Sequence, residues 1–372
     1  MSTITTNRTF WQDKTGIPGS IRETAEPLSD TTLSEAEVLV KVHAWGLNPI
    51  DAYLQDVPLP FVKYPLVPGT DVAGTVVRVG SGPGPGSGRF EAGDRVLAYA
   101  PGISFPERPE RGAFQEYTVL DSALVAKIPD AVSFAEAAVF PMCLATAAHA
   151  LFDAEFLGLP LPSLAGSSTS TSTGNGKGEE KLLLVVWGGA SAVGSNAVQL
   201  ARAAGLEVVA TCSPRNFERV RSLGARKVFD YRSETVIDDI VAELDGDGGK
   251  GKCVGIFQAA GITGDAIAPC CQVSARSRQK PFVACANAIP EGTVPEGVEA
   301  KFVLDWKAGR GMYHDVTAKL FGEFLEEALR SGTYKVAPRP EVVETRGLEG
   351  IQGGLDIVRK GVSAKKIVVL AE

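Results

Sequence analysis

The chain has 372 residues, of which 44% are hydrophobic and 22% charged, and its formal net charge is −7. A chain of this length can form two domains with separate cores, and the composition is ordinary for a globular protein. The negative charge provides no basic surface for nucleic acid or anionic lipid, so neither is expected as a partner. The N-terminal residues have no apolar signal core, and no run approaches the roughly 20 apolar residues of a membrane span, which predicts a cytoplasmic protein.

The cysteines lie in apolar segments and lack the spacing of zinc or redox motifs. We expect them to be reduced residues of the core rather than disulfides or metal ligands. They are Cys143, Cys212, Cys253, Cys270, Cys271 and Cys285.

Residues 10–127 are rich in short β-like runs interrupted by glycine and proline, as in a barrel-like all-β domain. The runs are VLVKVHAWGL (38–47), DVAGTVVRVG (71–80), DRVLAYA (94–100) and FQEYTVL (114–120). Between the second and third runs, SGPGPGSG (81–88) predicts a turn or loop. After Ser133 the sequence becomes alanine-rich with helical spacing, which predicts a helical connection to a second domain.

Residues 159–180 include SSTSTSTGNGKGEE, which has almost no apolar residue to bury. This composition predicts a flexible insertion at about 160–180 and favours a solvated tether over a functional loop.

The stretch from Leu182 to Ala204 reads as a buried strand, a small-residue turn and a helix in immediate succession. The turn lacks bulky side chains, so backbone N–H groups and the positive end of the following helix can approach a pyrophosphate. Its sequence is GGASAVG rather than a strict GxGxxG, and the alternative is an ordinary strand-to-helix turn. The predicted cofactor residues here are Gly188, Gly189, Ala190, Ser191, Ala192, Val193 and Gly194.

Strand-like and helical segments continue to alternate through residue 288, which predicts a parallel, doubly wound sheet and an α/β fold class. The expected strands are 207–212, 227–231, 253–261 and 281–288, with a helix over 217–223 ended by Gly224. A helix ended by Gly332, a strand within 336–344, a helix over 348–360 and a strand over 366–370 follow. These last elements have no place in the nucleotide domain, so we assign residues 1–132 and 310–372 to the first domain and 133–309 to the second.

The cofactor is expected to be NADP(H). NAD sites carry an Asp or Glu after the second strand, roughly 20 residues beyond the glycine turn. That position lacks a carboxylate here, and Ser213 and Arg215 can bond the 2′-phosphate instead. The alternative for Arg215 is a solvated residue at the start of a helix. Tyr231 is expected either to contact the same phosphate or the adenine, or to cap the sheet edge.

Six motifs stand in the order typical of one family: GLNPIDAYL (46–54), YPLVPGTDVAGTVVRVG (64–80), FEAGDRV (90–96), GAFQEY (112–117), CLATAAHAL (143–151) and WGGASAVG (187–194). Over nearly its whole length the chain resembles the medium-chain dehydrogenase/reductase superfamily. Within it, the chain is most similar to the zinc-independent, quinone-oxidoreductase-like branch, particularly fungal trans-acting enoyl reductases of polyketide pathways. The resemblance implies a GroES-like catalytic domain and a Rossmann domain with NADPH bound between them.

No metal is expected. In zinc-bearing relatives the stretch matching GLNPID carries a cysteine and the stretch matching PGTD carries a His-Glu pair, whereas this chain has Asn48 or its neighbours and Thr70-Asp71. Residues 97–113 contain no cysteine for a structural zinc site. The three histidines, His43, His149 and His314, lie in different elements and are each expected to make a local hydrogen bond.

The resemblance also implies roles for individual residues. Asn48 and Tyr53 would lie beside the nicotinamide, and Thr146 of the bridging helix would hold its carboxamide face. Tyr53 would orient the substrate carbonyl or relay a proton, or else serve as a wall residue while water delivers the proton. The remaining residues are Asp51, expected to brace its loop, and Asn287, Ser363 and Lys365, which match regions that close over the cofactor.

Without a Lewis acid, direct hydride transfer to an already polarised carbon is the chemistry that remains. We therefore predict an NADPH-dependent reductase of an enone or quinone double bond, acting on a small apolar or carrier-bound molecule. One alternative is a carbonyl or alcohol oxidoreductase on the same scaffold, and another is a cofactor-binding protein without turnover. A strand expected near residues 298–306 can pair across a two-fold axis, which leaves monomer and homodimer open.

Overall fold

The computed structural model describes residues 6–24, 33–81, 88–163, 181–246, 251–261, 265–304 and 310–372. The loop predicted at 81–88 and the insertion predicted at 160–180 lie mostly outside the described residues. Contacts divide the chain into two compact units, one of residues 1–142 and 305–372 and one of residues 143–304. The first unit therefore combines the two ends of the chain, and the second is one continuous segment.

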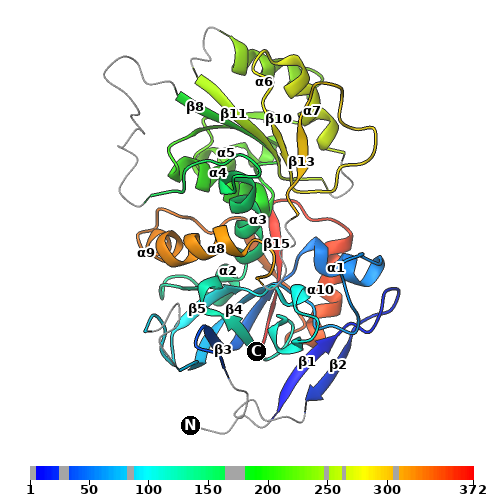
Figure 1. Cartoon of the computed structure of the whole chain (residues 1–372), viewed down its shortest axis with the longest axis vertical. Coiled ribbons are helices and arrows are strands. Elements are labelled where there is room, and N and C mark those ends of the chain that lie inside the picture. Colours follow the sequence, from blue (N-terminus) through cyan, green and yellow to red (C-terminus); the bar gives the residue numbers. More distant parts are fainter. Residues whose placement is uncertain are drawn as a thin grey trace. The chain divides into compact units, whose positions relative to one another are not determined.

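The first unit is built on a seven-stranded mixed sheet (Figure 1). Its strands are β3 (Glu37–Gly46), β4 (Asp71–Val79), β5 (Arg95–Tyr99), β6 (Tyr117–Asp121), β7 (Val125–Lys127), β14 (Arg339–Val342) and β15 (Lys365–Leu370). The order is β14-β15-β3-β4-β5-β7, with β6 also paired to β3. A separate hairpin joins β1 (Asn7–Trp11) to β2 (Ser20–Thr24).

Alternation along β3 creates the core of this unit. Val38, Val40 and Val42 are fully buried in one hydrophobic cluster, as expected for every second residue of a strand with one face toward the core. Helix α10 (Glu349–Arg359) adds Ile351 and Leu355 to the cluster and packs beside α1 (Pro49–Asp56). The unit also contains α2 (Phe134–Ala137), α8 (His314–Leu320), a π-helical turn (Phe321–Leu325), α9 (Glu326–Arg330) and short 3-10 helices at Gly102–Ser104, Pro109–Arg111 and Ser122–Leu124.

The second unit contains a parallel sheet of order β10-β9-β8-β11-β12-β13. Its strands are β8 (Lys181–Trp187), β9 (Glu207–Cys212), β10 (Lys227–Asp230), β11 (Gly251–Gln258), β12 (Val283–Cys285) and β13 (Ala300–Phe302). The chain runs outward from β8 to β10, crosses to β11 on the other side of β8, and continues to the edge strand β13. The predicted doubly wound sheet is confirmed, and its order reverses between β8 and β11.

Helices cover both faces of this sheet (Figure 1). The helices are α3 (Pro141–Phe152), α4 (Ala192–Ala203), α5 (Phe217–Ser222), α6 (Val236–Asp245) and α7 (Ile267–Arg276). Ile240 of α6 and Cys270 of α7 share a hydrophobic cluster with Val185. The fully buried neighbours of Val185 along β8 point to the opposite face, where α4 packs.

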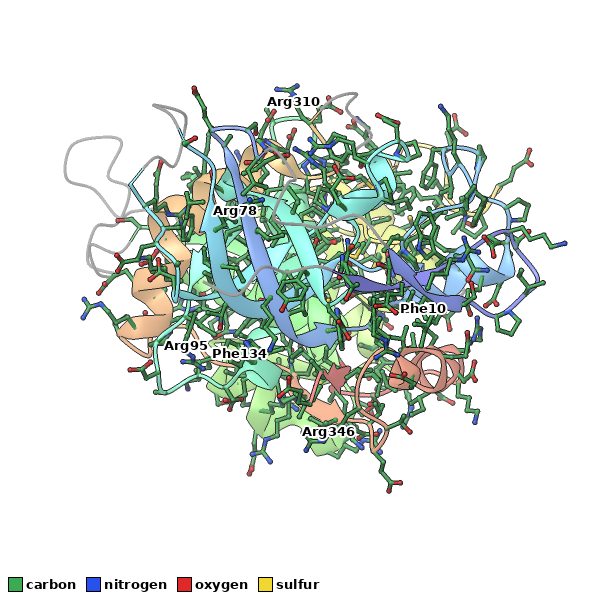
Figure 2. The ribbon with its side chains drawn as sticks, turned by 90° about the horizontal axis from the view of Figure 1, so that it is seen from below. Phe10, Arg78, Arg95, Phe134, Arg310 and Arg346 are labelled. Atoms are coloured by element: carbon green, nitrogen blue, oxygen red, sulfur yellow. The ribbon has the colours of Figure 1, made fainter. Side chains whose placement is uncertain are left out.

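Helix α2 belongs to the first unit, so the unit boundary falls later than the expected boundary after residue 132. Phe134 stacks on the His43 ring of β3 at 4.6 Å, and the Arg95 guanidinium lies over the Phe134 ring at 4.7 Å (Figure 2). The helical stretch 134–152 is long and apolar enough to span a membrane, which differs from the expectation that no such run exists. However, 78% of it is buried inside the structure, as in a core helix.

All six cysteines are buried and unbonded to one another, as predicted. Burial raises the pKa of Cys253 and that of Cys285 to about 12, which keeps both thiols protonated at neutral pH.

Candidate functional site

The structure brings the predicted cofactor residues of the second unit to one edge of its sheet. Residues 188–194 follow β8, Ser213 and Arg215 follow β9, Tyr231 follows β10, and Asn287 follows β12. Because the strands are parallel, their carboxyl ends lie at the same edge. This edge, beside the point where strand order reverses, is where ligands bind in open α/β sheets.

The turn after β8 has no room for side chains at two of its glycines. Gly188 has a φ of +94°, and a Cβ added there would lie 2.2 Å from the Cβ of Ala260. A Cβ on Gly194 would lie 2.2 Å from the carbonyl oxygen of Gly188. The turn is anchored to β9, because the Gly188 N–H donates to Thr211 Oγ1 at 3.0 Å. These glycines let the backbone itself form the surface of the turn.

Helix α4 begins at this turn with a capped N-terminus. The Ser191 hydroxyl accepts from the Gly194 N–H at 2.8 Å and donates to the Ala259 carbonyl at 2.7 Å. The first-turn N–H groups of Ala192 and Val193 have no carbonyl partner available within the helix, and both residues are partly exposed. With the positive end of the helix dipole, these groups fit a pyrophosphate.

The residues after β9 fit a second anionic group. Ser213 is nearly buried, whereas Arg215 is exposed on the short 3-10 helix Pro214–Asn216. The sequence from Cys212 to Phe217 contains no carboxylate. Tyr231 is 40% exposed, and the Arg232 guanidinium lies over its ring at 5.1 Å. This corner can accommodate a phosphate, and both interpretations of Tyr231 stay open.

Gln258, which the sequence analysis missed, lies at the same edge at the end of β11. Its side chain is fully buried, and its Nε2 donates to the carbonyl of Ala260. Its Oε1 has no hydrogen-bond partner among the described residues. The only sequence signal was an amide residue directly after the apolar run 253–257.

The first unit contains a buried polar group of four residues, Asn48, Thr70, Asp71 and Lys366, which we call the Asn48 cluster. Asn48 precedes α1, and its Nδ2 donates to Thr70 Oγ1 at 3.0 Å and to Asp71 Oδ2 at 2.9 Å. Asn48 Oδ1 accepts from Lys366 Nζ, which also lies 2.7 Å from Asp71 Oδ2. All four side chains are buried. Asp71 and Lys366 therefore form an internal ion pair, in which the carboxylate binds the NH₂ group of the Asn48 amide and the ammonium binds its carbonyl oxygen.

Asp51 braces the start of α1, as predicted. Its Oδ2 accepts from the Asn48 backbone N–H at 2.8 Å, and the backbone N–H of Gly69 also stabilises the carboxylate. Burial raises the pKa of Asp51 to about 7, and the negative charge of Asp71 acts in the same direction. The Asn48 N–H and the Lys366 ammonium oppose this rise without cancelling it.

The other predicted residues of the nicotinamide site lie on several different elements. Tyr53 is half-buried on α1, and burial raises the pKa of its phenol. Thr146 is buried on α3 and belongs to the second unit. Ser363 is exposed, and Lys365 is exposed and paired with Glu341. Their contacts with a nicotinamide remain predictions.

Lys366 is the functional candidate that sequence reasoning missed in this unit. Its neighbour Lys365 was chosen from the motif GVSAKKIVV, but successive strand residues point to opposite faces. The alternation of β15 therefore directs Lys365 to the surface and Lys366 into the interior. The sequence carried no local signal for this difference, because burial of β15 depends on its pairing with β14 and β3.

The described residues contain no group of three or more His, Cys, Asp and Glu side chains able to hold a metal ion. The three histidines make local contacts instead, as expected. His43 lies 3.1 Å from Thr75 Oγ1, His149 3.4 Å from Asp153, and His314 3.1 Å from Asp121. At the positions that carry zinc ligands in metal-bearing relatives, only Asp71 is a ligand type.

Two family models match the chain. Residues 34–130 match the alcohol dehydrogenase GroES-like domain, and residues 192–275 match the zinc-binding dehydrogenase domain. The predicted combination of a GroES-like and a Rossmann domain is thereby confirmed.

Curated relatives match over most of their length. The chain is 41% identical to dehydrogenase azaJ of Aspergillus niger, over 91% of this chain and 92% of the relative. It is 39% identical to trans-enoyl reductase himH of Aspergillus japonicus, over 90% and 89% respectively. Among solved structures, an alcohol dehydrogenase superfamily protein from Novosphingobium aromaticivorans has a TM-score of 0.71 at 21% identity, covering 98% of this chain and 100% of that one. At that identity the structural likeness supports the fold alone.

Proposed function

The chain belongs to the medium-chain dehydrogenase/reductase superfamily and is an oxidoreductase, and from this premise we propose that it is an NADPH-dependent reductase of an activated carbon–carbon double bond. The observation that carries the proposal is the Asn48 cluster. A catalytic metal ion needs three protein ligands from Cys, His or carboxylate side chains. The Asn48 cluster has a single carboxylate, and a lysine ammonium and an amide occupy the space around it. Such a site suits substrates whose own conjugation spreads the developing charge.

NADPH is proposed over NADH because of the residues that follow β9. A carboxylate at this place would accept the ribose hydroxyls of NADH and repel a 2′-phosphate. Ser213 and Arg215 instead offer a hydroxyl and a guanidinium, which suit a phosphate.

When bound, the cofactor supplies a hydride. In this proposal, the first-turn N–H groups of α4 and the glycine turn hold the pyrophosphate, while Ser213 and Arg215 hold the 2′-phosphate. The Tyr53 hydroxyl orients the substrate carbonyl or returns a proton to the reduced substrate. Partial burial raises the pKa of the Tyr53 phenol, so the hydroxyl is protonated at neutral pH, as either role requires.

The names of two relatives support a substrate class. Dehydrogenase azaJ and trans-enoyl reductase himH are fungal proteins, and the name of the second states enoyl reduction. We propose a small apolar or carrier-bound α,β-unsaturated carbonyl compound or quinone of fungal secondary metabolism as the substrate.

Isotope transfer tests the reaction. Purified protein is incubated with NADPH deuterated at C4 of the nicotinamide and with matched sets of enones, quinones and aldehydes. Deuterium at the β-carbon of an enone supports the proposal, and Tyr53→Phe should then lower kcat more than it weakens NADPH binding. Label only at a carbinol carbon establishes the carbonyl reductase instead. Tight NADPH binding without turnover of any substrate would favour a non-catalytic cofactor-binding protein.

A further inference from the structure

We propose that Lys366 is a positioning residue: its ammonium, anchored by Asp71, fixes the orientation of the Asn48 amide and thereby the start of α1, which carries Tyr53. This inference rests on the proposed function, because it assigns Lys366 a part in setting that site. The ammonium acts through Asn48.

The charges of the ion pair permit one orientation of the amide. Asn48 Oδ1 faces the Lys366 ammonium, and Asn48 Nδ2 faces the Asp71 carboxylate. Turning the amide over would set N–H groups against an ammonium and a carbonyl oxygen against a carboxylate. Because all three side chains are buried, solvent screens neither repulsion.

The sheet is shaped to bring the two charges together across one strand. Lys366 lies on β15 and Asp71 on β4, and β3 runs between these strands. At the crossing point stands Gly46, where an added Cβ would lie 3.1 Å from Lys366 Cε, 3.0 Å from Asp71 Cβ and 2.2 Å from the Ala138 carbonyl oxygen. The absence of a side chain at Gly46 leaves the space in which the aliphatic part of Lys366 crosses β3.

Stability alone does not account for this pair. Desolvating two charges offsets most of their attraction, so apolar side chains of similar volume stabilise a core as well or better. The ion pair instead contributes orientation, because it holds the Asn48 side chain, which precedes α1, in one geometry. Asp71 is itself fixed, because its Oδ1 accepts from the Met142 backbone N–H at 2.6 Å.

The orientation is transmitted to α1 through the backbone of Asn48. The Asn48 N–H is bound by Asp51, so the residue is held by its side chain and by its main chain. Tyr53 lies on the same short helix. A shift of Asn48 therefore displaces the helix that carries the proposed proton-handling hydroxyl, and misplacement of this kind slows catalysis more than it weakens binding.

Kinetics and stability of three variants test the proposal. Lys366→Met leaves the Asp71 charge buried and unpaired, so both Tm and kcat should fall. Adding Asp71→Asn removes that charge, so Tm should recover in Lys366→Met/Asp71→Asn. The kcat for enone reduction should nevertheless stay about 10- to 100-fold low, with KM for NADPH nearly unchanged, because two neutral neighbours no longer select one amide orientation. Recovery of kcat together with Tm would show a purely structural role and overturn the proposal.

Lys127→Met is the matched control. Lys127 lies in the same sheet and pairs with Asp94 at 2.9 Å, but it is one-third exposed. Its loss should leave both kcat and Tm near the wild-type values.

A spectroscopic measurement separates this proposal from the proposed reaction. With asparagine selectively labelled with ¹⁵N, the Asn48 side-chain amide should give one slowly exchanging pair of signals in the wild-type protein. In Lys366→Met/Asp71→Leu, which removes both charges and adds no asparagine, the same amide should give two pairs or a broadened pair. A single slowly exchanging Asn48 pair in this variant would overturn the positioning role. This measurement needs no substrate, so it holds even if the wild-type protein reduces no enone.

Discussion

The Ser191 hydroxyl donates a 2.7 Å hydrogen bond to the carbonyl oxygen of Ala259, which joins the turn after β8 to the residue after β11. These are the two strands between which the order of the parallel sheet reverses. The next residue, Ala260, is the one that a side chain on Gly188 would strike. The turn after β8 is therefore closely packed against the residues that follow β11. A single methyl group added at Gly188 should displace the whole turn.

Gly188→Ala tests this closure, with Gly205→Ala as its control. Both glycines have positive φ, +94° and +86°, so alanine at either should cost about 1–2 kcal/mol of unfolding free energy. Only at Gly188 does the new Cβ meet another atom, at 2.2 Å, whereas at Gly205 nothing lies within 4 Å. Gly188→Ala should therefore lose more stability in urea unfolding and bind NADPH more weakly by fluorescence titration. Equal effects at the two positions would contradict the close-packed turn.

Arg215→Ala should distinguish the two nicotinamide cofactors. Loss of a charge-assisted contact to the 2′-phosphate should weaken NADPH binding by about 1.5–3 kcal/mol and leave NADH binding nearly unchanged. Isothermal titration with both cofactors measures the difference. Arg226→Ala is the control, because Arg226 precedes β10 at the other end of the sheet and pairs with Glu207 and Glu243. An equal loss for NADPH and NADH would defeat the assignment.

Asp51 should make stability depend on pH in an unusual direction. Its pKa is raised from 3.8 to about 7, so the folded state binds a proton that the unfolded state releases. The stabilisation is complete below pH 3.8 and is lost as pH rises through 7; at 1.36 kcal/mol per pKa unit it reaches ~4 kcal/mol. Asp51→Asn keeps an acceptor for the Asn48 N–H but cannot titrate. Urea unfolding between pH 4 and pH 8 should show wild type losing stability relative to this variant, and parallel curves would refute the shift.

His314 should titrate above its ordinary pKa of 6.5. Its hydrogen bond to Asp121, at 3.1 Å, raises the pKa of the imidazole more than burial lowers it, and the pKa of Asp121 falls in return. This pair stabilises the fold fully between pH 3.8 and pH 6.5, and it loses its effect as pH rises through the raised value of His314 or falls through the lowered value of Asp121. Proton NMR of the three histidines should show a high pKa for His314 that drops in Asp121→Asn. The pKa of His43, lowered by burial, serves as the internal reference.

Elemental analysis should find no stoichiometric zinc in the purified protein, and chelators should not reduce its activity. The reason is the composition of the Asn48 cluster, where a lysine and an amide accompany a single carboxylate. One tightly held zinc per chain, lost together with activity on chelation, would overturn the proposed metal-free chemistry.

The strands and the nucleotide turn could be predicted because their signals are local. Continuous apolar residues predicted β8 as a strand covered on both faces. The absence of side chains at Gly188 and Gly194 predicted a turn whose backbone N–H groups a ligand can approach. Each signal fits within a few residues of chain, so periodicity and turn chemistry suffice to find it.

The Asn48 cluster could not be predicted in the same way. Its ion pair joins residues 295 positions apart, and its geometry depends on β15 lying beside β3. Lys365 was expected to lie over the cofactor, and no burial was expected at Lys366, since unpaired lysines are rarely buried. Only the pairing of strands from the two ends of the chain decides which of the two enters the interior.

The division of the first unit between residues 1–142 and 305–372 has a consequence for synthesis on the ribosome. The second unit is continuous and can fold as soon as residue 304 has left the exit tunnel. The first sheet must wait for β15, which lies between β14 and β3 and ends two residues before the last. Until then Asp71 has no Lys366 with which to pair. A ribosome stalled just before residue 365 should therefore carry a folded second unit and a first unit whose sheet is incomplete.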